Sequence, residues 1–265
     1  MVKTYKMNKH LYAQLAARLD NSLLTNKAIE CLTVKNPQLT VRDAYQIQSK
    51  GILLRQKRGE KIIGYKMGLT SSAKQKQMNV TAPISGVLTD KMQINDNQTI
   101  SVNKCIQPKA EMEIAFITKN DLRGNVAADE ALLACGGVCA AIEIIDSRYL
   151  DFKFTLIDVI ADNCSASGFV LGPIIQITGI DFATLGMDFI VNQTVIEHGS
   201  SGAVSGNPVN SLILLVQQLT DQGLYLKAGS IVLTGTPTNA ITLTADQHLV
   251  NKTETLGSAS IFCRD

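Results

Sequence analysis

The chain has 265 residues and contains no tryptophan, only three histidines and six cysteines. No apolar run approaches the ~20 residues that a membrane-spanning helix needs, so no such helix is predicted. The segment Met1–Lys9 is polar and charged, and it lacks the apolar stretch of a signal peptide. The cysteines form neither a CxxC pair nor a dense framework, which predicts reduced, mostly buried thiols and a cytoplasmic location.

The charge balance is close to neutral, with a net charge of +2 and no pronounced basic patch. Binding to nucleic acid or to a membrane surface is therefore not predicted. A hydrophobic content of 45% with 18% charged residues is typical of a globular protein with a substantial core.

The chain divides into a helical part and a strand-rich part. Residues 9 to about 59 are expected to be helical, and Thr40 with Asp43 forms a variant of the capping box before a second helix. The first helix carries leucines at intervals of four, at Leu11, Leu15 and Leu19. We predict an α+β fold with a small helical region at 1–61 and a mostly β domain at 62–265.

Short runs of β-branched residues, separated by glycine and proline, predict the strands of the second part. The expected strands are Ile62–Lys66, Glu111–Thr118, Cys139–Ile145, Gly168–Leu171, Asp188–Val191, Ile231–Thr234 and Ser258–Cys263. Two helices are expected among them, a short one at Asp129–Cys135 and a longer one beginning at Asn207-Pro208. The glycine-rich segment Gly199–Pro208 is interpreted as a structural loop that enters this helix.

Three glutamates on two predicted strands are the strongest functional signal. Glu111 and Glu113 would point to the same face, because side chains at i and i+2 share a face of a strand. Alone, this pair could be the polar face of an exposed strand. Glu143 lies between apolar residues, and a buried glutamate needs a partner. A divalent cation explains all three, and the scarcity of histidine favours an oxygen-preferring ion, Mg²⁺ or Mn²⁺.

Lys66 ends a predicted strand, before Gly68 and the polar stretch at 71–77. Partial burial beside Tyr65 and Met67 would lower the pKa of this lysine and suit it to proton transfer. The alternative is a surface lysine that leaves an edge strand.

Arg148 follows the strand that carries Glu143. It could hold a substrate carboxylate in a bidentate pair, with Ser165 as a further hydrogen-bond donor. The alternative, favoured without further information, is that Arg148 pairs with Asp146 or Asp151.

Several ordered motifs resemble the fumarylacetoacetate hydrolase superfamily over nearly the whole chain. More narrowly, they are similar to its group of 2-keto-4-pentenoate hydratases and 4-oxalocrotonate decarboxylases. The matching segments are Gly64–Ser71, Pro108–Glu113, Glu143–Arg148, Ala161–Ser165, Gly206–Pro208 and Leu233–Gly235. The resemblance implies a mixed β-roll with a small helical amino-terminal part.

The resemblance also implies roles for individual residues. It places Mg²⁺ or Mn²⁺ on Glu111, Glu113 and Glu143, and it puts Lys66 in the active site. The backbone at Leu69 and the Ser165 hydroxyl match positions that hold the carboxylate of a 2-oxo acid. Homo-oligomers are usual in this family, and its decarboxylases and hydratases can associate with each other.

The motifs favour one reaction of this group. The hydratases resemble P-D-x-G after the lysine segment, whereas this chain has Pro83–Gly86 with Ile84, which cannot move a proton. The decarboxylases resemble P-I-x-G, and they carry an I-D-S-R-Y…F-K-F stretch that is matched by Ile145–Tyr149 and Phe152–Phe154. The implied activity is metal-dependent decarboxylation of a 2-oxo-alkenedioate such as 2-oxo-3-hexenedioate to 2-hydroxypenta-2,4-dienoate.

Other activities remain open at this point. The segment Leu233–Pro237 is more similar to hydrolases and oxaloacetate decarboxylases of the wider superfamily. A hydratase of 2-hydroxypentadienoate, an oxaloacetate or acylpyruvate enzyme and a non-catalytic partner of a related enzyme are the alternatives. Lys109 and Thr236 are further candidates for substrate binding.

Overall fold

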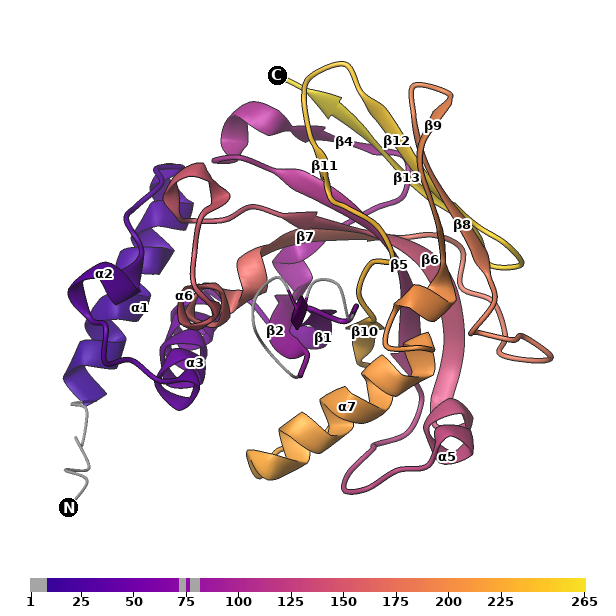
Figure 1. The fold of residues 1–265 in the computed structure, drawn as a ribbon, viewed down its shortest axis with the longest axis horizontal. Helices are drawn as coiled ribbons and strands as arrows, with labels where there is room; N and C mark the ends of the chain where they lie inside the picture. Colours follow the sequence, from indigo (N-terminus) through magenta and orange to yellow (C-terminus); the bar gives the residue numbers. More distant parts are fainter. Residues whose placement is uncertain (1–8, 72–74, 77–81) are drawn as a thin grey trace.

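The computed structural model describes residues 9–71, 75–76 and 82–265, and Figure 1 shows its fold. The polar amino-terminal segment 1–8 and most of the polar stretch at 71–77 lie outside these residues.

The amino-terminal part is helical, as predicted. It consists of α1 (Lys9–Thr25), α2 (Leu32–Lys35) and α3 (Val41–Lys57). Leu15 and Leu19 are buried on the predicted apolar face of α1. The capping box is confirmed, because the Thr40 hydroxyl accepts a hydrogen bond from the Asp43 N–H and the Asp43 carboxylate accepts one from the Thr40 N–H.

Helices α5 (Ala128–Leu133), α6 (Leu156–Ala161) and α7 (Pro208–Asp221) interrupt the strands. Asn207 caps α7 as predicted, since its side-chain oxygen accepts a hydrogen bond from the Val209 N–H at 2.9 Å. Helix α5 is shorter than expected, because Cys135 already begins a strand. Figure 1 shows α1–α3 and α6 gathered on one side of the sheets and α7 lying across another face.

Two sheets form the rest of the fold. The described strands of the larger sheet follow the order β2-β1-β10-β5-β6-β7-β3, and β11 also pairs with β5. They are β1 (Ile62–Gly68), β2 (Ile84–Thr89), β3 (Gln93–Ile94), β5 (Lys109–Thr118), β6 (Cys135–Ile145), β7 (Ala166–Leu171), β10 (Ile231–Leu233) and β11 (Ile241–Thr242). Parallel and antiparallel pairs are mixed, since β1 runs parallel to β10 and β5 runs antiparallel to β6.

The smaller sheet has the order β4-β13-β12-β8-β9. Its strands are β4 (Gln98–Ser101), β8 (Gly186–Val191), β9 (Thr194–Ser200), β12 (His248–Thr253) and β13 (Gly257–Arg264). A buried amide joins it to the larger sheet. The Asn251 side chain donates hydrogen bonds to the backbone carbonyls of Glu113 (2.9 Å) and Ala141 (2.7 Å), which fixes β5 and β6 from behind.

Every predicted strand is present within one to four residues of its expected bounds, and the α+β class is confirmed. Sequence patterns missed α6 and the strands β2, β3, β4, β9, β11 and β12. Strand β2 contains Gly86, which weakens a strand signal but is required here. A Cβ at Gly86 would lie 2.7 Å from the Asn163 carbonyl oxygen. The division of the chain at residue 61 stays a prediction, because Ile84 and Tyr149 of the second part share a hydrophobic cluster with the amino-terminal helices.

Arg148 corrects one hypothesis from the sequence, because the structure does not direct it toward a substrate. Its side chain is 3% exposed and forms an ion pair with Asp162, which is neither of the two partners suggested. The guanidinium also donates to the backbone carbonyls of Asp146 (2.7 Å) and Ala166 (3.2 Å). Arg148 thus joins the end of β6 to the turn after α6, and most of its N–H donors are used within the protein.

We predict that Arg148→Met lowers the free energy of unfolding by about 3–5 kcal/mol, because Asp162 is then a buried carboxylate without a partner. Urea unfolding followed by circular dichroism measures the change. Arg58→Met is the matched control, since the Arg58–Asp20 pair is part-exposed and its loss should cost only about 0–1 kcal/mol. Equal stability losses in the two variants would contradict the structural role of Arg148.

Candidate functional site

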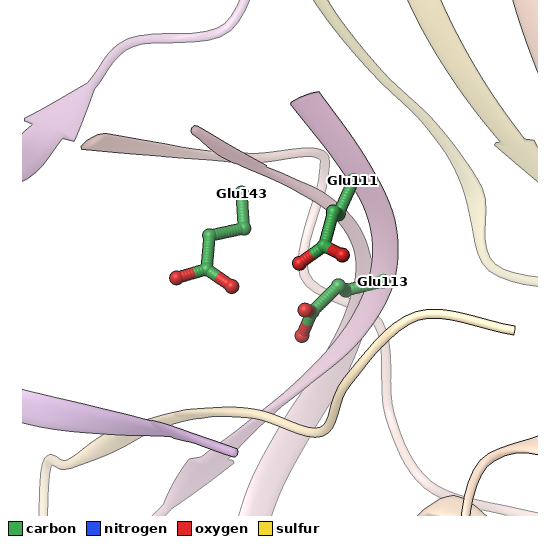
Figure 2. A group of neighbouring side chains, drawn as sticks. All are labelled: Glu111, Glu113 and Glu143. Carbon is green, nitrogen blue, oxygen red and sulfur yellow. The ribbon is translucent and has the colours of Figure 1, made fainter. Parts of the chain in front are cut away.

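Three glutamate side chains meet at the centre of the larger sheet. Strands β5 and β6 place Glu111 directly opposite Glu143, with Glu113 two residues farther along β5. Figure 2 shows the three carboxylates pointing toward one another. One carboxylate oxygen from each lies within 4.8 Å of the others. Glu113 and Glu143 are fully buried, and Glu111 is 9% exposed.

The close approach changes how these groups ionise. Burial, followed by the charge of Glu143, raises the pKa of Glu113 well above its ordinary value. Burial also raises the pKa of Glu143 to about 7, against the opposing effect of the Lys66 ammonium. Like charges placed opposite each other destabilise a strand pair. The site therefore needs positive charge beyond what one lysine supplies.

The hydrogen bonds around the site leave oxygens for a cation. Glu113 accepts a hydrogen bond from the Gly235 N–H at 2.7 Å on one oxygen, and Glu143 accepts one from Lys66 Nζ at 2.6 Å. Within the described part of the chain, Oε1 of Glu113 and Oε1 of Glu143 are buried without a hydrogen-bond partner. Buried polar atoms are normally satisfied. Three neighbouring carboxylates, two of them with such oxygens, fit Mg²⁺ or Mn²⁺, which prefer hard oxygen ligands.

Lys66 lies on β1 with its side chain only 3% exposed, so it is not a surface lysine. The expected direction of its pKa shift is wrong. Burial alone lowers the pKa of Lys66, but the nearby carboxylates outweigh burial and raise the pKa above its ordinary value. The sequence-based expectation considered only burial. In the structure, the Lys66 ammonium is fixed by its ion pair with Glu143 and compensates part of the acidic charge.

An unusual turn presents Ser165 to the site. Asn163, Cys164 and Ser165 have consecutive positive φ angles of 51°, 52° and 59°. Such backbone is costly for residues other than glycine and persists only where the surroundings enforce it. The Asn163 side chain holds the turn against β2, because its oxygen accepts from the Val87 N–H (2.8 Å) and its amide donates to the Val87 carbonyl (2.9 Å). Within the described residues, the buried Ser165 hydroxyl has no hydrogen-bond partner, which leaves it for a ligand.

A cavity of about 500 Å³ opens beside the glutamates. Most sequence-predicted site residues line it, namely Lys66, Leu69, Lys109, Glu111, Ser165 and Thr236. Glu113 and Glu143 lie buried next to Glu111, and Arg148 is not among the lining residues. Leu69 adopts a positive φ of 55°. The structure therefore brings together all the predicted site residues except Arg148.

Sequence reasoning missed two contributors to the site. Gly235 has a φ of 103°, and a Cβ there would lie 2.2 Å from Thr70 Oγ1, so only glycine can bring its N–H to Glu113 at this point. The motif at Leu233–Pro237 includes Gly235, but its spacing does not predict a hydrogen bond from the Gly235 N–H to Glu113. Phe152 lines the cavity from a 3₁₀ turn, η3 (Leu150–Phe152).

In the described part of the chain, no helix combines the length and apolar character needed to cross a membrane.

Known proteins are similar to this chain in sequence and in fold. The chain is 40% identical to a 4-oxalocrotonate decarboxylase from Pseudomonas sp, over 94% of this chain and 96% of the relative. It is 36% identical to a 2-keto-4-pentenoate hydratase from Burkholderia vietnamiensis, over 84% of this chain and 86% of that protein. The structure of 4-oxalocrotonate decarboxylase from Pseudomonas putida G7, complexed with magnesium and adipate, superimposes with a TM-score of 0.94 at 35% identity. That match covers 97% of this chain and 99% of the other.

The family assignment rests on most of the chain. The model of the fumarylacetoacetate (FAA) hydrolase C-terminal family matches residues 61–260, which include all residues of the candidate site and both sheets except the last four residues of β13. The superposition also confirms the expected mixed β-roll with a helical amino-terminal region. The chain therefore belongs to the fumarylacetoacetate hydrolase C-terminal family.

Proposed function

We propose that this protein is a metal-dependent lyase that decarboxylates a 2-oxo-alkenedioate, with 2-oxo-3-hexenedioate as the candidate substrate. The single observation that carries the proposal is the buried glutamate triad beside a cavity of about 500 Å³. Within the described residues, two of its oxygens, Oε1 of Glu113 and Oε1 of Glu143, lack a hydrogen-bond partner. Three relatives that are 36–40% identical over more than nine-tenths of this chain are 4-oxalocrotonate decarboxylases. A 2-hydroxyhexa-2,4-dienoate hydratase from Comamonas testosteroni is also 36% identical, over 92% of this chain.

The residues around the cavity would hold the 2-oxo acid end of the substrate. Glu111, Glu113 and Glu143 would hold Mg²⁺ or Mn²⁺. The Ser165 hydroxyl and the backbone at Leu69 would donate hydrogen bonds to the C1 carboxylate, since both residues line the cavity. Thr236, only 3% exposed, lines the same cavity and adds a second hydroxyl to it.

The reaction breaks the C5–C6 bond and releases the remote carboxylate as CO₂. The electron pair left on C5 moves through the conjugated chain to the C2 oxygen, which takes up one proton to give 2-hydroxypenta-2,4-dienoate. A bound cation would supply Lewis-acid stabilisation of that oxygen, worth several kcal/mol. Lys66 Nζ holds a proton 2.6 Å from Glu143 and would donate it, or a hydrogen bond, to the same oxygen.

The apolar wall of the cavity favours decarboxylation over hydration. Ile84, Ile145 and Val159 are buried and line the cavity. Ile84 stands where the hydratase pattern has an aspartate, so the structure offers an aliphatic group where water would need a base. Hydratase relatives nevertheless keep hydration as the alternative, and both reactions share the metal centre.

The first test is an ultraviolet progress curve with 2-oxo-3-hexenedioate and, separately, 2-hydroxypenta-2,4-dienoate, each with Mg²⁺, Mn²⁺ or EDTA. We expect metal-dependent consumption of the first with CO₂ release, and no hydration of the second. Turnover of the second alone would replace the proposal by the hydratase alternative. Absence of turnover with both would direct the search to oxaloacetate and acylpyruvates.

Glu143→Gln should weaken Mg²⁺ binding by at least about ten-fold, because it removes a ligand charge from a buried site. Isothermal titration calorimetry of the purified protein with MgCl₂ measures the affinity. Glu130→Gln, on exposed α5, is the matched control and should bind like the unchanged protein. Unchanged Mg²⁺ affinity in Glu143→Gln would remove this residue from the metal centre.

Lys66→Met should lower kcat by about 10²–10⁴-fold, the usual contribution of a positioned proton donor. Mg²⁺ binding should persist, because the three carboxylates remain and the competing ammonium is gone. Calorimetry and the progress curve are run on the same preparation, with Lys91→Met at an exposed position as control. If Lys66→Met kept the full kcat, Lys66 would have no part in proton transfer and would serve only to balance the charge of the glutamates.

A further inference from the structure

Lys109 lies on β5, the strand that carries Glu111 and Glu113, and it lines the same cavity as Glu111. Residues 109, 111 and 113 of β5 share one face, because side chains at i and i+2 point the same way. Exposure increases along this face, from fully buried Glu113 through Glu111 to half-buried Lys109. Lys109 and Glu111 are two positions apart in an extended strand, which places their Cα atoms about 7 Å from each other. The cavity thus has the carboxylates at one end and the Lys109 side chain at a distance from them along β5.

Phe152 holds the Lys109 ammonium in place. Nζ of Lys109 lies 4.3 Å from the centre of the Phe152 ring. Phe152 and the preceding Asp151 have φ angles of 57° and 56°, a costly conformation for both residues. A contact with an aromatic face fixes the cation but leaves its N–H donors for other partners. Among the ion pairs of the described residues, none joins Lys109 to a carboxylate.

A second lysine at the cavity is placed differently. Lys153 also lines the cavity, but its side chain is 83% exposed. Its ammonium lies 3.7 Å from the Asp151 carboxylate, which is 76% exposed. Water and this carboxylate already solvate Lys153, so an additional anion gains little from it. Lys109 is the better anion site because it is half-buried and oriented by Phe152.

We propose that Lys109, seated on Phe152, binds the remote carboxylate of the substrate and selects 2-oxo dicarboxylates over 2-oxo monocarboxylates. This inference rests on the proposed function only in placing the 2-oxo acid end at the glutamate centre. Decarboxylation removes the group that Lys109 binds, so the product loses this contact while the substrate has it. The same subsite therefore favours entry of the dicarboxylate and release of the product.

The test compares two unreactive ligands that differ only at the remote end, 2-oxoadipate and 2-oxohexanoate. Their affinities are measured by calorimetry on the full chain with saturating Mg²⁺. We expect the unchanged protein to prefer 2-oxoadipate by on the order of ten-fold or more, the usual gain from a charge-assisted hydrogen bond. Lys109→Gln should abolish the preference by weakening 2-oxoadipate alone, and Lys109→Arg should keep most of it. Lys153→Gln is the matched control and should retain the preference.

The outcomes separate this inference from the proposed function. Equal binding of both ligands by the unchanged protein, or a preference that persists in Lys109→Gln, overturns the role of Lys109 and leaves the 2-oxo acid site intact. If neither ligand binds in a metal-dependent manner, both the role of Lys109 and the proposed function are overturned. A loss of preference in Lys153→Gln but not in Lys109→Gln would assign the subsite to Lys153 and contradict the proposal. Unchanged affinity for 2-oxohexanoate in Lys109→Gln shows that the variant is folded and that its metal centre is intact.

Discussion

Repulsion among three buried carboxylates is the constraint on which the rest of the site depends. Glu111 and Glu143 face each other across two central strands, and Glu113 adds a third acidic group. Such an arrangement opposes strand pairing unless positive charge and hydrogen-bond donors balance it. Lys66 and the Gly235 N–H supply part of this balance, and two carboxylate oxygens have no hydrogen-bond partner among the residues that the structure describes. Affinity for a divalent cation follows directly from the incomplete compensation.

The balancing groups require unusual backbone. Gly235 reaches Glu113 with a φ of 103°, and Ser165 is presented by three consecutive residues with positive φ. The Asn163 side chain stabilises that turn by bonding both backbone groups of Val87. Several residues with costly backbone conformations thus line the cavity, where they orient ligand-binding groups. The long strands β5 and β6 remain regular in the segment that carries the glutamates.

The sequence predicted features that depend on local spacing and missed those that depend on distant neighbours. Alternation along two strands predicted the glutamate triad, and capping residues predicted α3 and α7. The direction of the pKa shift of Lys66 was wrong, because the carboxylates that raise it belong to strands far along the chain. The partner of Arg148 was also missed, since Asp162 lies 14 residues farther along the chain, at the end of the unpredicted helix α6. Strand β2 lacked a clear pattern because its glycine serves a contact with Asn163.

The sequence separation of the interacting groups links the site to the cooperativity of folding. Strands β5 and β6 are neighbours in the chain, but Lys66 contacts Glu143 across 77 residues and Gly235 contacts Glu113 across 122. A partly folded chain that paired β5 with β6 alone would bring the carboxylates together without their donors. Bringing each donor to its carboxylate closes a long loop and costs chain entropy, although this cost rises only slowly with loop length. Central strand pairing is therefore favourable only when β1 and β10 are also in place, so that the acidic centre penalises incomplete folds.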